Sequence, residues 1–369
     1  MDPKITKISE EKGKLYFTVT GIKVPYVNAL RRTILSDIDI NICNTITYEE
    51  NQCTITKNTS RFHNEIIKQR LSCIPIHQKE LSTLPGNYVL EIDVENDTDD
   101  TIFVTTEDFR IKSKTSGNYL TKNEVLKIYP SSKETGQFID FLRLRPKISD
   151  SIKGEHIKLN SEYSIGNANL DSMFNVASIC SYGNTVDMIK ANEEWEKHEL
   201  SLKSQEELSE KEIEFEKKNF YALDAQRYFT ENSFDFVIET VGIYDNKELV
   251  LKGCEAMNNR LKKLIEKIDN DEIKVTIPQL ATSNAYQMSF VNEDYTIGKV
   301  IEDNLYEKHY IDDKTMSFVA FKKLHPHDEA SILKMAFIMD VDNNYIRQVV
   351  RTALVESMEV FDKLYKLFK

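Results

Sequence analysis

Two adjacent arginines interrupt an otherwise apolar helix face. A helix is predicted from about residue 26 to residue 38, because apolar residues recur there at helical spacing: Val27, Leu30, Ile34 and Ile38. On a helical wheel Arg31 falls near the middle of this stripe and Arg32 flanks it. A buried guanidinium without acceptors is strongly unfavourable. Two explanations carry equal weight: salt bridges within the chain's own core, or docking of this edge on another protein that supplies acceptors.

No other pattern indicates a reactive or metal-binding site. The five cysteines are scattered, without the C-x₂₋₄-C spacing of a zinc or iron–sulfur centre, and are interpreted as free thiols in a reducing compartment: Cys43, Cys53, Cys73, Cys180 and Cys254. His325 and His327 flank a proline, which favours a structural turn over a metal pair. A P-loop, a G-x-S-x-G elbow, an H-E-x-x-H motif and a clustered acidic triplet are all absent from the sequence. We therefore expect no catalytic residue, no metal site and no cofactor.

The composition predicts a soluble protein of two or three domains. The 369 residues are 40% hydrophobic and 29% charged, a globular balance. No apolar run approaches the ~18 residues of a membrane span, and the start lacks the order of a secretion signal. The formal net charge is -12, whereas a chain that grips DNA by itself usually carries a basic surplus. We expect no membrane contact, no direct DNA contact and an intracellular location.

The predicted elements fall into two similar layouts. The front portion has a strand at 14–20, the arginine-bearing helix, a helix at about 63–72, a strand at 234–240 and a long helix at about 247–268. The apolar stripe of that long helix fits a seam against a partner helix: Val250, Cys254, Met257, Leu261, Leu264 and Ile268. Between these elements, residues 77–150 alternate in strand fashion and predict a compact, mostly β insert.

The last hundred residues repeat the front layout in brief. Strands are predicted at 273–277 and 286–291, then a helix at about 296–305, strands at 316–322 and 331–339, and a closing helix at about 344–368. The two helices carry apolar stripes on one side each: Ile297, Val300, Ile301 and Leu305 in the first, and Ile346, Val350, Ala353, Ser357, Val360 and Leu364 in the second. The chain is thus a quasi-duplication of roughly 100 residues per unit, with the first copy interrupted by insertions.

Residues 190–219 are almost entirely charged. We interpret them as a solvated helix or a mobile loop. A rival hypothesis makes the protein an adaptor that binds partners through this segment. It ranks lower, because the segment lacks the sustained apolar heptad repeat of a coiled coil.

Five motifs in order resemble one protein family. Residues 27–38 (VNALRRTILSDI) resemble the N-A-L-R-R-x-x-L-S-x-I signature of the α-type subunits of cellular RNA polymerases. Residues 64–76 and 236–242 are similar to two further segments of those subunits, N-E-[IV]-x-x-x-R-L-x-x-[IV]-P-[IL] and F-x-[VI]-E-[ST]-x-G. Residues 293–301 and 318–326 resemble the smaller partner subunit, with E-D-H-T-L-G-N-L-[LI] and F-A-G-Y-K-x-P-H-P. Single-chain fusions of the two partners resemble the arrangement in large DNA viruses.

The sequence also departs from the family pattern. Tyr295 replaces the usual histidine and Lys299 the asparagine, Ala320 stands for a glycine and Leu324 for a proline. Many relatives carry a cysteine cluster in the inserted domain, whereas residues 77–150 contain no cysteine, so no metal is expected there.

The resemblance implies an α+β fold in which two RNA polymerase α-type dimerisation domains pair within one chain. The expected domains are residues 1–76 with 151–269 (larger-partner type, carrying the charged insertion at 190–219), residues 77–150 (insert) and residues 270–369 (smaller-partner type). The pairing residues would be Val27, Leu30, Ile34, Val250, Met257, Leu261, Leu264, Ile297, Val300, Ile301, Ile346, Val350, Ala353 and Val360.

The same resemblance implies a function in assembly. The chain would be a non-catalytic platform, monomeric within a DNA-directed RNA polymerase, that docks directly on the second-largest subunit. The docking residues would be Arg31, Arg32, Asn64, Glu65 and Arg70. The largest subunit and small zinc-containing subunits would complete the complex. A viral protein of this kind would work in the host-cell virus factory and possibly be carried in the virion.

Overall fold

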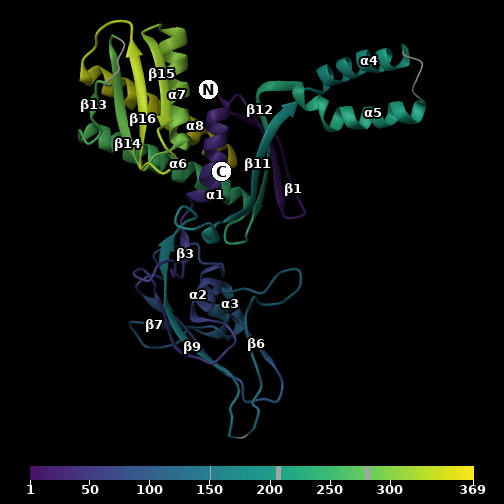
Figure 1. Cartoon of the computed structure of the whole chain (residues 1–369), viewed down its shortest axis with the longest axis vertical. Coiled ribbons are helices and arrows are strands. Elements are labelled where there is room, and N and C mark those ends of the chain that lie inside the picture. Colours follow the sequence, from purple (N-terminus) through teal and green to yellow (C-terminus); the bar gives the residue numbers. More distant parts are fainter. Residues whose placement is uncertain (150, 205–208, 279–282) are drawn as a thin grey trace. The chain divides into compact units, whose positions relative to one another are not determined.

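The computed structural model describes residues 1–149, 151–204, 209–278 and 283–369, and its fold is α+β (Figure 1). The chain forms two compact units. Unit 1 comprises residues 1–33, 179–239 and 250–369, and unit 2 comprises residues 34–178 and 240–249. Asp150, which the sequence placed at the end of the insert, and residues 205–208 of the charged segment lie outside the described residues.

The first sheet of unit 1 is antiparallel at its centre and carries two helices. Its strands are β1 (Lys4–Glu11), β2 (Lys14–Thr20), β11 (Ala177–Val186) and β12 (Phe229–Thr240), in the order β1-β2-β12-β11. Helix α1 (Val24–Ser36) follows β2, and α6 (Asn246–Asp269) follows β12. Along β2 the buried side chains alternate in part with exposed ones, because one face of the sheet is covered by helices.

The second sheet of unit 1 repeats this topology. Its strands are β13 (Val275–Thr276), β14 (Ala285–Val291), β15 (Met316–Lys323) and β16 (Ala330–Phe337), in the order β13-β14-β16-β15. Helix α7 (Tyr295–Leu305), continued by the π-helix η4 (Tyr306–Asp312), follows the second strand, and α8 (Asn343–Phe368) follows the fourth. Both sheets therefore place their strands in the order first, second, fourth, third, with a helix after the second and the fourth.

A helical hairpin separates β11 from β12, which are neighbours in the first sheet. Its helices are α4 (Met188–Ser204) and α5 (Glu210–Ala222). Together with the 3-10 helix η3 (Asp224–Arg227), they form a small core of their own, made of Ala191, Trp195, Phe220 and Ala225. In its described part the charged segment is therefore helical, which is one of the two alternatives that the sequence left open.

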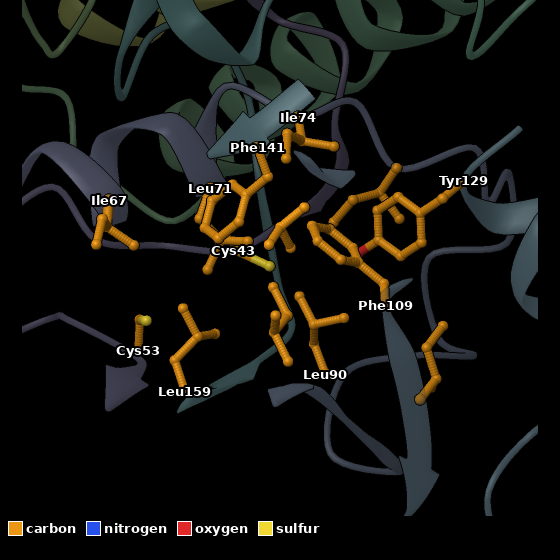
Figure 2. Packing of buried hydrophobic residues seen from close by; sticks show 14 of the residues in the cluster. Cys43, Cys53, Ile67, Leu71, Ile74, Leu90, Phe109, Tyr129, Phe141 and Leu159 are labelled. Atoms are coloured by element: carbon orange, nitrogen blue, oxygen red, sulfur yellow. The ribbon is translucent and has the colours of Figure 1, made fainter. Parts of the chain in front are cut away.

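Unit 2 is built around a sheet in the order β4-β9-β5-β7. These strands are β4 (Cys53–Asn58), β5 (Tyr88–Glu95), β7 (Arg110–Ser113) and β9 (His156–Glu162), and two smaller pairs join β3 (Ile40–Ile42) to β10 (Ser164–Gly166) and β6 (Ile102–Thr105) to β8 (Asp140–Leu144). Helices α2 (Asn64–Ser72) and α3 (Lys122–Ile128) complete it. Figure 2 shows the core that they enclose, with Leu71 of α2 near Phe141 of β8.

This sheet crosses the insert boundaries expected from the sequence. Strand β9 pairs with β5 on one side and with β4 on the other, although β4 and β9 lie outside residues 77–150. Unit 2 accordingly extends from residue 34 to residue 178. The alternating pattern of the strands marked where the β-structure is, but it carries no information on which strands share a sheet.

None of the helices in the described part of the chain is long and apolar enough to cross a membrane.

Candidate assembly interface

Helices α1, α6, α7 and α8 bury the apolar stripes that the residue spacing predicted. The predicted pairing residues are all between 0% and 5% exposed: Val27, Leu30 and Ile34 on α1, Val250, Met257, Leu261 and Leu264 on α6, Ile297, Val300 and Ile301 on α7, and Ile346, Val350, Ala353 and Val360 on α8. Burial of each such side chain contributes roughly 1.5–3 kcal/mol. These stripes are the apolar component of the candidate interface.

Helix α1 contacts α8 through a buried hydroxyl pair. The Tyr26 hydroxyl lies 3.2 Å from the Ser357 hydroxyl, and the Tyr26 ring lies 5.8 Å from the ring of Phe361. Ser357 donates its own proton to the carbonyl of Ala353, so Tyr26 is left as the donor in the pair. Burial raises the pKa of Tyr26 to about 12, which keeps this hydroxyl protonated.

The end of α1 is joined to the start of α7 by an arginine fork. Arg32 places Nη2 2.6 Å from Oδ2 of Asp294 and donates from Nε to the hydroxyl of Thr296 at 2.7 Å. Asp294 is also the N-cap of α7, accepting from the Thr296 backbone N–H at 2.9 Å. Burial opposes ionisation of Asp294, but the Thr296 hydrogen bonds and the charges of Arg32 and Arg260 outweigh it and lower its pKa.

Helix α6 supplies a second arginine to the same loop. Arg260 lies 2.7 Å from Glu293 and 3.9 Å from Asp294. Burial raises the pKa of Glu293, and the charge of Arg260 offsets only part of that effect. The pair of carboxylates before α7 is thus held between two arginines, one from α1 and one from α6.

Further polar links run from α6 to α8. Asn258 donates to Asp362 at 2.6 Å, and Arg351 donates to Asp269 at 2.8 Å. The ring of Phe17 on β2 lies 4.9 Å from that of Phe368 near the end of α8, edge to face. Every one of these contacts joins a residue before position 270 to one after it. The two polar links lie at the surface and add only ~0–1 kcal/mol each, so their main effect is to fix the register of the helices.

Arg31 differs from its neighbour. It is half-buried, and its Nε donates to the side chain of Asn28, one turn earlier, at 3.0 Å. Among the described residues no carboxylate lies within ion-pair distance of Arg31. The sequence left two explanations open, and an internal salt bridge is the one that applies to Arg32. The guanidinium of Arg31 keeps its charge, and N–H donors other than Nε remain available for an acceptor outside the chain.

The remaining predicted docking residues lie on or beside α2 in unit 2. Asn64 and Glu65 are exposed at the start of that helix. The Arg70 guanidinium bonds two backbone carbonyls of β8, from Nε to Phe141 at 2.6 Å and from Nη2 to Asp140 at 2.7 Å. Arg70 therefore fastens α2 to β8. Arg31 belongs to unit 1 and α2 to unit 2, so they form separate surfaces.

Sequence reasoning missed the acceptors of this interface. Glu293 and Asp294 were noted only as part of a motif, and Arg260 was not singled out. The signal was present for Asp294, because an aspartate shortly before the first residue of an apolar helix stripe, here three residues before Ile297, is a preferred N-cap.

Metal-binding clusters do not occur among the residues that the structure describes: no group of three or more His, Cys, Asp or Glu side chains is placed to hold an ion. Cys73 is exposed and the other four cysteines are buried. Burial raises the pKa of the Cys43 thiol to about 12, so that thiol stays protonated.

Comparison with known proteins gives one family. Residues 16–261 match the family described as RNA polymerase Rpb3/Rpb11 dimerisation domain, over more than half of the chain. The chain is 38% identical over 71 residues to DNA-directed RNA polymerase subunit Rpo3 of Thermococcus kodakarensis, covering 19% of this chain and 25% of the relative. It is 37% identical over 73 residues to DNA-directed RNA polymerases I and III subunit rpac1 of Dictyostelium discoideum, covering 20% of this chain and 19% of the relative. These matches thus span a quarter or less of each relative's length.

Proposed function

Because the chain belongs to the RNA polymerase Rpb3/Rpb11 dimerisation domain family, we propose that it is a non-catalytic subunit of a DNA-directed RNA polymerase. In this proposal two dimerisation domains, one on each side of residue 270, pair within a single polypeptide. The pair serves as the platform on which the two large catalytic subunits assemble. A single chain with both partners would be a fusion of the kind found in large DNA viruses.

The observation that carries the proposal is the repeated topology of unit 1. Both sheets have the strand order first, second, fourth, third, with helices after the second and fourth strands. The polar links of Arg32, Arg260 and Arg351 all run from the first copy to the second. Covalent linkage raises the effective concentration of the two copies to roughly millimolar, which adds to the affinity that the buried stripes supply.

Two separate docking surfaces for the second-largest subunit are proposed, one at Arg31 on unit 1 and one at Asn64 and Glu65 on unit 2. Arg32 and Arg70 act as positioning residues, because their guanidinium groups are engaged inside the chain. The largest subunit and small zinc-containing subunits complete the assembly. The net charge of -12 is consistent with a place in the complex away from DNA.

A charge reversal at Arg31 tests this proposal. An affinity-tagged Arg31→Glu chain, co-expressed with the other polymerase subunits, should unfold at the wild-type temperature but recover several-fold less of the two large subunits. Arg110→Glu, on the exposed end of β7, is the matched control and should recover them fully. Recovery of both large subunits at the wild-type level by Arg31→Glu would remove this face from the interface. If the wild-type chain itself recovered neither, the proposed function would be wrong.

A further inference from the structure

The α4–α5 hairpin occupies a position that a short turn would fill. Strands β11 and β12 are adjacent in the sheet, and antiparallel neighbours are commonly joined by two to five residues. Here residues 187–228 intervene, and they carry their own core around Trp195 and Phe220, whose rings are 5.5 Å apart. The pairing of β11 with β12 does not require this insertion, which indicates that the surface of the hairpin has a function of its own.

Helices α4 and α5 lie side by side (Figure 1). Trp195 lies in the hairpin core, and the Tyr221 hydroxyl on α5 donates to Asn192 at 2.7 Å. The Trp195 indole N–H donates to Glu199 at 2.9 Å. The burial of Trp195 and the Tyr221–Asn192 hydrogen bond determine which side of α4 faces α5 and which side faces away from it.

The outward face of α4 is an apolar and acidic stripe. Ile189, Glu193, Glu196 and Leu200 recur at i, i+4, i+7 and i+11 and so share one face of the helix, opposite Ala191 and Trp195. Ile189 is 73% exposed and Leu200 is 69% exposed. A solvated helix normally presents polar residues on its outward side. Two large exposed apolar side chains, one at each end of this stripe, are therefore unexpected.

The hairpin's own lysines neutralise other carboxylates of α4 and leave the stripe charged. Lys197 lies 2.6 Å from Glu194, and Lys203 lies 2.6 Å from Glu199. Both Glu193 and Glu196 are exposed, and in the described part of the chain neither has a cation within 4 Å. The stripe thus combines two unpaired negative charges with two apolar anchors.

We propose that this face of α4 docks a basic segment of another protein. The segment carries two apolar side chains, spaced to reach Ile189 and Leu200, and lysine or arginine between them for Glu193 and Glu196. Eleven residues of helix separate the anchors by about 16 Å. Apolar anchors supply affinity, while the carboxylates select a basic partner and speed its association. This site is additional to the assembly role, because it uses neither α1 nor α2.

A designed peptide serves as the probe. It is a labelled helix with leucines at i and i+11 and lysines at i+4 and i+7 in an alanine–glutamine background, and binding to the intact chain is followed by fluorescence anisotropy. We expect saturable binding that weakens with added salt. The variant Glu193→Gln with Glu196→Gln should weaken it by about tenfold, and Ile189→Ser with Leu200→Ser should abolish it.

The control carries the same change of charge on the other helix. Glu210→Gln with Glu216→Gln on α5 should leave binding unchanged. Trp195 is the chain's one tryptophan, so its fluorescence reports whether each variant keeps the hairpin core. Absence of binding by the lysine peptide would overturn the proposal. Equal binding of a peptide with glutamates in place of the lysines would also overturn it. The same holds if the α5 control lost as much affinity for the lysine peptide as the α4 variant. Self-association of the chain through this face would replace the basic partner by a second copy.

Discussion

Arg31 and Arg32 carry the same side chain at successive positions, yet their surroundings differ. The acceptor of Arg32, Asp294, comes from 262 residues further along the chain, and a helical wheel has no access to such a partner. Arg31 bonds only locally, to Asn28. The wheel identified where guanidinium groups interrupt the apolar face, and tertiary packing decided which of them is used inside the chain.

Replacement of Asp294 by alanine should destabilise the protein by about 1 kcal/mol near neutral pH, because α7 loses its N-cap and Arg32 loses its partner. The folded pKa of Asp294 lies below its ordinary value of 3.8. The stabilisation from its ionised form is therefore fully present above that pH and is lost as the pH falls through the lower folded pKa. Thermal unfolding followed by circular dichroism would measure it.

The difference in stability between wild type and Asp294→Ala should become smaller as the pH falls into the acid range. The raised pKa of Glu293 acts in the opposite direction, since it favours the folded state at low pH, and the comparison of the two proteins largely removes it. Asp294→Asn, which keeps a capping side chain without the charge, is the control and should lose less stability near neutral pH. A gap that stays constant down to about pH 2 would show that ionisation of Asp294 does not stabilise the fold.

At the scale of an element, α7 depends on a glycine that is unusual within a helix. The ring of Phe321 on β15 occupies the space beside Gly298, and a Cβ at that position would come within 2.1 Å of ring carbons. Phe321 is buried, so the ring has little room to move. Glycine costs a helix roughly 1 kcal/mol relative to alanine, and here it lets α7 lie against the sheet.

The substitution Gly298→Ala should therefore destabilise the protein by about 1–3 kcal/mol, despite the better helix propensity of alanine. Denaturant unfolding would give the change in free energy. Adding Phe321→Leu should restore part of the loss in the double variant, because the smaller side chain makes space for the methyl group. If Gly298→Ala were more stable than wild type, the close approach of ring and helix would be wrong.

The elements themselves were predicted unevenly. The long helices α6 and α8 were located within one or two residues, because their apolar stripes extend over many turns. Strand β1 was missed, since it is an edge strand whose side chains are almost all exposed and half of them charged. Helix α3 was absorbed into a β prediction because only Val125 and Ile128 are buried in its seven residues, although Thr121 and Glu124 form a capping box.

At the scale of the whole molecule, the interface residues fall into those that could be predicted from the sequence and those that could not. The apolar stripes could be read from spacing alone. The polar partners could not, because Asp294, Glu293 and Asp362 meet their arginines and asparagine only when two distant parts of unit 1 come together. Apolar periodicity identifies the face of a helix that must be buried. Which other element buries that face is decided by the tertiary fold.

The two copies of the repeated topology in unit 1 should hold each other without the peptide bond between them. A protease site inserted in the exposed turn after α6, at Asn270, would allow the folded chain to be cut there. We expect the two fragments to elute together in size-exclusion chromatography after complete cleavage, and to separate only in denaturant. Separate elution of the fragments under native conditions would contradict the account.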